Sequence, residues 1–198
     1  LRLILPESCL DGPSVETDIM EINNTMSRYL REERFALLPQ TMIYVERTLH
    51  NGKLRRGLVG MVDLEQYDYE PGSPAQVRAT EGTVLSRIPP RVAVRKNAPI
   101  ELPHVMLLTD DPERTVIEPL AREKAGMEQV YDFDLMERGG HLAGWKLGRE
   151  QLSAVAGALQ ALADPAAFNA RYGTQDQPVL LFAVGDGNHS LATAKECY

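Results

Sequence analysis

A run of six apolar residues at positions 179–184 is the feature that most constrains how this chain can fold. It lies between Pro178 and Gly185, two residue types that interrupt regular structure. A short apolar run bounded in this way is typical of a central strand that is buried on both faces. Residues 189–198, which follow closely, predict a helix. The chain is therefore expected to contain a strand, a tight turn and a helix in direct succession.

The turn between this strand and helix has the sequence Gly185-Asp186-Gly187-Asn188-His189-Ser190. Its glycines permit positive φ angles and close approach of a ligand to the backbone, and Asp186 and Asn188 can cap the helix. The first turn of a helix presents amide N–H groups, which suits an anion such as phosphate. There His189 can donate to a phosphate, act as acid or base, or bind a metal. A plain helix start with a packed histidine is the alternative.

Periodicity and turn residues predict the remaining elements. Helices are expected at 14–38, 115–125 and 150–163, with a short one from Pro165, and strands at 41–49, 54–64, 76–83, 104–108 and 128–135. A hairpin is expected at Asn51-Gly52, a chain break at Pro89-Pro90, and another hairpin turn within 136–145. Strands and helices do not alternate regularly. The predicted fold is therefore α+β (mixed α/β), with β-hairpins, helices and a buried strand–turn–helix joint near the C-terminal end.

Composition and charge limit the class of protein. A hydrophobic content of 43% in 198 residues supports a packed core, and a net charge of −7 argues against nucleic acid as a partner. Cys9 and Cys197 form no CxxC pair, so a cytoplasmic location is expected. No apolar run is long enough to span a membrane. Residues 1–198 are expected to form a single domain, the N-terminal part of a longer protein, because Leu1 is not Met and Tyr198 ends inside an expected helix.

Several motifs, in the same order, resemble those of a bacterial and archaeal family named domain of unknown function 1015. They are Arg56-Gly57-Leu58-Val59-Gly60, Thr80-Glu81-Gly82-Thr83, Gly140-His141 with Trp145, and residues 185–194, which resemble the family's Asp-Gly-x-His turn. The resemblance covers roughly residues 44–198. It implies no particular activity, because the biochemical role of the family is not established.

A weaker likeness links the same turn to the phosphate-contacting turn of the ParB, sulfiredoxin and free serine kinase group. It implies that residues 185–190 hold nucleotide phosphates and that His189 contacts them. The chain departs from that pattern, because Asn188 replaces a histidine and Ser190 replaces an arginine that would clamp phosphate with two hydrogen bonds. A serine hydroxyl and helix amides can still hold a phosphate, with positive charge supplied by Arg78, Arg87 or Arg91.

Two hypotheses of function follow. In the first, the chain is an enzyme of the phosphotransferase type. His189 contacts the phosphate, Asp186 orients the ligand or binds Mg²⁺ with a nucleotide, and Glu81 acts as base. The residues expected to bind phosphate are Gly185, Gly187, Asn188, Ser190, Arg78 and Arg87. The second hypothesis is a non-catalytic phosphate- or nucleotide-binding regulatory module, which the serine at position 190 favours. DNA binding by analogy with ParB ranks third because the chain is acidic.

Two further polar groups have structural interpretations. His141 lies between Gly140 and the motif residue Trp145, which favours a turn histidine over a catalytic one or a ligand. Asp110 and Asp111 precede an expected helix, so a capping role is favoured over a metal pair.

Overall fold

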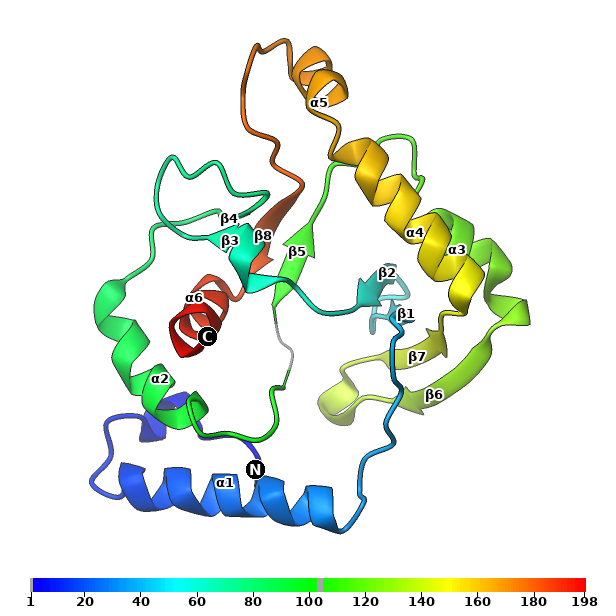
Figure 1. Ribbon diagram of the computed structural model, residues 1–198. Helices are drawn as coiled ribbons and strands as arrows, with labels where there is room; N and C mark the ends of the chain where they lie inside the picture. The colour runs from blue at the N-terminus through cyan, green and yellow to red at the C-terminus, as the bar shows by residue number, and fades with distance from the viewer. Residues whose placement is uncertain (1, 103–104) are drawn as a thin grey trace. The chain divides into compact units, whose positions relative to one another are not determined.

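The computed structural model describes residues 2–102 and 105–198, and this part of the chain contains six α-helices and two four-stranded sheets. The mixed α/β class predicted from the sequence is confirmed. The chain divides into two compact units (Figure 1). The first comprises Leu1–Leu37, Asp63–Thr109 and Phe182–Tyr198, and the second comprises Leu38–Val62 and Asp110–Leu181. Among the described helices none is both long and apolar enough to cross a membrane.

An antiparallel sheet with the strand order β2-β1-β7-β6 forms the framework of the second unit. The elements of this unit are β1 (Ile43–Thr48), β2 (Leu54–Val59), α3 (Glu118–Glu123), β6 (Glu128–Asp134), β7 (His141–Lys146), α4 (Arg149–Leu162) and α5 (Pro165–Tyr172). The predicted hairpin at Asn51-Gly52 joins β1 to β2, and Gly52 adopts a φ of 78°. A second hairpin joins β6 to β7, and β7 pairs with β1.

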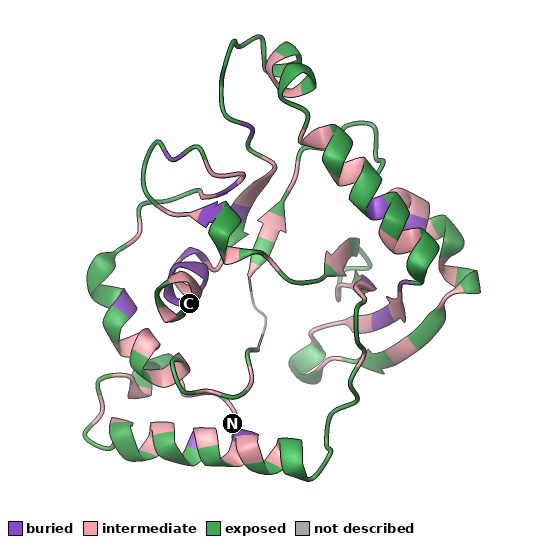
Figure 2. Ribbon diagram, in the orientation of Figure 1, coloured by how far each residue is buried: buried purple, intermediate pink, exposed green. Residues whose placement is uncertain are grey.

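The core of the second unit surrounds Tyr44, which is fully buried. Val116, Leu120, Leu147 and Val155 are buried around it. Figure 2 shows the buried parts of the chain in purple. The face of α4 that its spacing predicted packs here, since Leu152, Leu159 and Leu162 join Val155 in the same cluster. Burial of one such side chain contributes about 1.5–3 kcal/mol, so this cluster is the main source of stability in the unit.

A mixed sheet with the order β3-β4-β8-β5 forms the framework of the first unit. Its elements are α1 (Val15–Arg31), β3 (Tyr67–Asp68), β4 (Val77–Ala79), α2 (Ile88–Arg95), β5 (Met106–Leu108), β8 (Phe182–Asp186) and α6 (Asn188–Cys197). Strands β3, β4 and β8 run parallel, and β5 pairs with β8 in the antiparallel direction. The strand predicted before the glycine-rich turn therefore does have a neighbour on each side.

Three expectations about the first unit are wrong. Pro89 and Pro90 do not break the chain but occupy the first turn of α2, where a missing N–H group leaves no helical hydrogen bond unmade. The strand expected at 76–83 ends at Ala79, and residues 80–84 form a loop. β8 begins at Phe182, and Val184 is its one buried residue, since Phe182 and Ala183 are half-buried and Gly185 and Asp186 are exposed.

Other elements differ in length or burial. Residues 106–108 of the strand expected at 104–108 form β5, and His104 lies outside the described residues. Met106 and Leu108 are 46% and 54% exposed, so β5 is an edge strand. In the second unit, Asp111 accepts hydrogen bonds from the Thr115 and Val116 amides, as its capping role predicted, and α3 begins only at Glu118. Helix α1 ends at Arg31, before the expected position 38.

The substitution Gly140→Ala tests the packing of β7 against β1. Gly140 has a φ of 94°, and a Cβ atom there would lie 2.0 Å from the Thr48 carbonyl oxygen. We expect the free energy of unfolding to fall by about 2 kcal/mol or more, because the backbone must shift. Urea denaturation measures this.

Gly157→Ala is the matched control. A Cβ atom at Gly157 on α4 meets nothing within 4 Å, so alanine there should stabilise the protein by about 0.5–1 kcal/mol. Equal unfolding midpoints for the two variants would contradict the close approach at Gly140.

Candidate functional site

The two candidate motifs of the first unit meet because β4 and β8 are neighbouring parallel strands. Ala79 lies opposite Val184 in this pairing. Parallel strands end at the same edge of a sheet, so the segments that follow them are neighbours. The segment after β4 is the 80–84 loop, and the segment around the end of β8 is the 185–190 turn. The sheet therefore brings together two motifs that lie about a hundred residues apart in the sequence.

The side chain of Asn188 holds these two segments together. It is 5% exposed, and its Oδ1 accepts a hydrogen bond from the Thr80 amide at 3.1 Å. Its Nδ2 donates to Thr80 Oγ1 at 3.3 Å and to the Val184 carbonyl at 3.4 Å. Thr80 Oγ1 in turn donates to the same carbonyl at 2.5 Å. Because the amide provides both a donor and an acceptor, it satisfies backbone groups of both strands. The expectation that Asn188 caps α6 is wrong, since its side chain points back to the sheet.

The glycines of the turn have different roles. Gly187 caps α6 with a φ of 84°, a left-handed conformation that glycine adopts at little cost. The backbone bond from Leu191 N to Gly187 O at 2.9 Å opens the helix, so the amides of residues 188–190 precede its internal hydrogen bonds. A Cβ atom at Gly185 would lie 2.8 Å from Leu108 Cδ1. Gly185 therefore makes room for β5, whereas Gly187 shapes the helix start.

His189 lies in the first turn of α6 and contacts the 80–84 loop with its ring. Its Nε2 accepts a hydrogen bond from the Val84 amide at 3.1 Å, and its Nδ1 lies 4.0 Å from Glu81 Oε1. A ring nitrogen that accepts carries no proton, so the neutral ring has its proton on Nδ1. The side chain is 18% exposed. The structure thus brings the predicted pair, His189 and Glu81, together and directs the Nδ1 proton to the Glu81 side.

Two carboxylates flank the turn. Asp186 is exposed, and its Oδ1 accepts a hydrogen bond from the Gly187 amide at 2.8 Å. The Glu81 carboxylate lies near Nδ1 of His189. Their negative charges oppose a bare phosphate, and a divalent cation would offset them. Within the described ranges no three His, Cys, Asp or Glu residues are grouped to hold a metal.

The arginines predicted to supply positive charge have no hydrogen bond or ion pair with the 185–190 turn among the described residues. Arg78 donates from Nη1 to the Ser73 carbonyl at 3.1 Å, in the loop before β4. Arg87 is exposed at the start of α2, and its carbonyl accepts a hydrogen bond from Arg91 at 2.6 Å. Arg91 also pairs with Glu7. These contacts of Arg78 and Arg91 therefore lie in the loop before β4 and on the N-terminal side of the unit, and the Arg87 side chain is exposed.

Arg95 is the cation that reaches the turn, and sequence reasoning missed it. Its Nη1 donates to Ser190 O at 2.6 Å and to Ser190 Oγ at 3.3 Å. Its Nε and Nη2 bind the Glu101 carboxylate at 3.0 and 2.8 Å. The signal was the spacing of Arg91 and Arg95, four residues apart on one helix face. That signal was lost because Pro89 and Pro90 were interpreted as a break in the chain.

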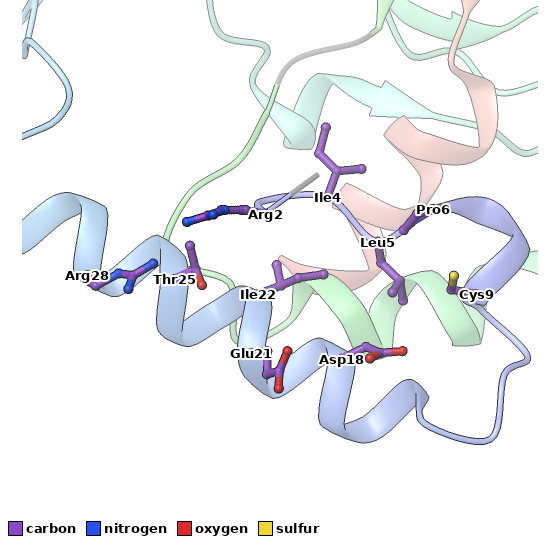
Figure 3. A pocket seen from close by; sticks show the side chains of 10 residues that line it. All are labelled: Arg2, Ile4, Leu5, Pro6, Cys9, Asp18, Glu21, Ile22, Thr25 and Arg28. Carbon is purple, nitrogen blue, oxygen red and sulfur yellow. The ribbon is translucent and has the colours of Figure 1, made fainter.

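A pocket of about 420 Å³ lies in another part of the first unit, between the N-terminal segment and α1 (Figure 3). Its lining combines both signs of charge with apolar side chains and comprises Arg2, Ile4, Leu5, Pro6, Cys9, Asp18, Glu21, Ile22, Thr25 and Arg28. Its volume falls in the range of small-ligand sites. It includes no residue of the 80–84 loop or the 185–190 turn, so it is a separate feature.

The fold and site define a mixed α/β protein in which a strand–turn–helix joint is locked to a second polar loop. The family model described as "Protein of unknown function (DUF1015)" matches residues 1–198. The chain belongs to this family, and the resemblance seen in its motifs is confirmed. Neither a curated protein nor a solved structure matches the chain.

The substitution Asn188→Ala tests the lock between the two segments. It removes three hydrogen bonds and leaves the Thr80 amide without its acceptor. We expect the free energy of unfolding to fall by about 1–3 kcal/mol, since buried polar groups lose their partners. Thermal denaturation measures the loss. The control is Asn24→Ala, at an exposed position on α1, where alanine should be neutral or slightly stabilising. A loss no larger than in the control would refute the lock.

Proposed function

We propose that the 185–190 turn, completed by the 80–84 loop, binds the phosphate group of a nucleotide or another small phosphorylated molecule. The observation that carries this proposal is the placement of His189 Nδ1 and Glu81 Oε1, 4.0 Å apart, at the N-terminus of α6. A hydrogen-bond donor, a carboxylate and the positive end of a helix dipole then converge on one surface.

Each group has a role in the proposed site. The amides of Asn188 and His189 and the Nδ1 proton of His189 donate to phosphate oxygens. Arg95, whose charge is paired with Glu101, holds Ser190 in place behind the turn. A Mg²⁺ ion that arrives with the nucleotide would be shared between the phosphates and Asp186. In an enzyme, Glu81 then serves as the base, since phosphoryl transfer depends mainly on positioning and on neutralised charge. The free thiols of Cys9 and Cys197 fit the proposed cytoplasmic location.

A non-catalytic binding module is the second candidate function, and one contact favours it. The His189 Nε2 already accepts a hydrogen bond from Val84 N, so one face of the ring is used to hold the loop. A histidine in this position organises a site more readily than it transfers protons through Nε2. Ser190 is also uncharged, whereas an arginine at this position would supply positive charge. The net charge of −7 keeps DNA in third place among the proposed ligands.

Calorimetry tests whether the protein binds a phosphate ligand at all, as both proposals require. ATP, ADP, CTP and inorganic phosphate are titrated into the protein with and without Mg²⁺. We expect nucleotide binding that strengthens with Mg²⁺, because the ion offsets Asp186 and Glu81. No heat with any of these ligands at millimolar concentration would overturn both phosphate proposals.

Two substitutions at His189 separate its structural contact from its proposed ligand contact. His189→Gln places an amide near the Nε2 position, so it keeps an acceptor for the Val84 amide and loses the Nδ1 donor. We expect near-normal stability and about tenfold weaker nucleotide binding, since one hydrogen bond to a charged group contributes about 1.5–3 kcal/mol. His189→Asn keeps a polar group near Nδ1 and should lose stability instead.

The control for this pair is His50→Gln, in the exposed β1–β2 turn. It should change neither the stability of the protein nor its nucleotide affinity. Calorimetry and thermal denaturation are run on all four proteins. Nucleotide affinity of His189→Gln equal to that of the unmodified protein would remove His189 from the proposed binding site.

Turnover distinguishes the enzyme from the module. Nucleotide hydrolysis or transfer is followed by phosphate release with Mg²⁺ present. In the enzyme, Glu81→Gln should abolish turnover while the dissociation constant changes by less than about threefold, and His189→Ala should abolish turnover as well. Binding without turnover in the unmodified protein would support the module.

A further inference from the structure

His141 lies between two carboxylates at the turn end of the β6–β7 hairpin. Its Nε2 lies 2.7 Å from Asp132 Oδ1, and its Nδ1 lies 2.8 Å from Asp134 Oδ1. A neutral imidazole has a single N–H group, so it can donate to only one of these oxygens. Both contacts are hydrogen bonds only when the ring is an imidazolium. Asp134 is also the cross-strand partner of His141, so the contact joins the last residue of β6 to the first of β7.

The turn that this contact closes has a strained backbone. Glu137 and Arg138 have φ angles of 56° and 55°, and Gly140 has a φ of 94°. Non-glycine residues adopt the left-handed region only at an energetic cost. Inside the turn, the Leu135 amide donates to the Gly140 carbonyl at 2.7 Å. Side-chain contacts just outside the turn therefore help to keep it closed.

We infer that His141 is a pH-sensitive latch, which holds the turn of residues 134–141 closed when its ring is charged and releases the turn when the ring loses a proton. A neutral ring would direct a lone pair at one carboxylate, and repulsion would replace one hydrogen bond. This latch is independent of the proposed phosphate site.

The latch gives the Gly140-His141 and Trp145 motif a physical meaning. Gly140 permits the close approach of β7 to the Thr48 carbonyl, where a Cβ atom would collide. Trp145 packs against Tyr44 with ring centroids 5.8 Å apart, and the Lys124 ammonium lies 4.9 Å from its ring centre. Trp145, near one end of β7, thus packs against the core, and His141, at the other end, is held by its contacts with two carboxylates.

The groups around His141 determine the direction of its titration. Thr48, its partner on β1, is neutral. The charged groups on the surrounding elements are Glu128, Asp132 and Asp134 on β6, Lys146 on β7, Glu46 and Arg47 on β1, Arg55 and Arg56 on β2, Lys124 after α3, and Glu137 and Arg138 in the turn. Glu46 is held by Lys124 at 2.7 Å, and Arg47 donates to the Gly139 carbonyl at 3.1 Å. The two aspartates therefore determine the charge state of the ring.

These two contacts give the latch a defined pH window. The hydrogen bond to Asp134, with a further one to Asp132, raises the pKa of His141 above its ordinary value of 6.5, although desolvation opposes the rise. A group with a raised pKa in the folded state stabilises that state fully below its unfolded pKa. While both aspartates are ionised, the latch is therefore closed below about pH 6.5 and opens as the pH rises through the raised pKa of His141.

Nuclear magnetic resonance tests the latch on the intact chain. The ring signals of His141 are titrated, and the protection factor of the Leu135 amide is measured across the same pH range. We expect the protection factor to fall about threefold as the ring loses its proton, in line with two exposed ion pairs. Asp134→Asn should lower the pKa of His141 and make the protection factor independent of the ring. Asp132→Asn should also lower the pKa of His141, by a smaller amount, and weaken the dependence of the protection factor on the ring.

Asp176→Asn is the matched control, because it removes an exposed carboxylate at a φ of 53° that asparagine tolerates. It should leave the titration of His141 unchanged, and the His50 signals serve as an internal reference in every variant. A Leu135 protection factor that stays constant while His141 titrates would overturn the latch. An unchanged pKa of His141 in Asp134→Asn would overturn it as well.

Discussion

The carboxamide of Asn188 is buried between the ends of β4 and β8, and both of its polar atoms are used. An amide without partners in such a place would cost several kcal/mol, so its position is fixed by the groups that it binds. Thr80 is held at the end of β4 by this contact, and the 80–84 loop starts from Thr80. The position of Glu81 beside His189 therefore depends on a side chain that faces away from solvent. At the other end of the loop, the Val84 amide donates to His189 Nε2.

Two histidines show how hydrogen-bond partners determine the chemistry of one side chain. His189 accepts from a backbone amide, which leaves the neutral ring with its proton on Nδ1. His141 faces two carboxylates, which require a proton on both nitrogens. Both residues belong to motifs that resemble those of the family to which the chain belongs. One motif is proposed to bind a ligand, and the other fastens a hairpin.

Much of the second unit could be predicted from the sequence, because its long elements have clear periodicity. Helix α4 and the hairpin at Gly52 lie where the pattern predicted them, and Asp164 caps α5 through the Ala167 amide at 2.7 Å. In the first unit, β3 and β4 have two and three residues, too few for a periodic signal. β4 pairs in parallel with β8, which lies far from it in the sequence, so no local pattern predicts that Glu81 lies beside His189. Only the motifs indicated that the two residues belong to one site. The role of Arg95 was missed because prolines in the first turn of a helix resemble a break.

We propose that the 80–84 loop and the 185–190 turn form one ligand site. The amide chemical shifts of the ¹⁵N-labelled protein, followed while Mg²⁺ and ATP are added, show whether both segments contact the same ligand. We expect the amides of residues 187–190 and 80–84 to shift together with one dissociation constant, while those of the pocket beside α1 stay unchanged. Shifts confined to the pocket, or in one of the two segments without the other, would contradict it.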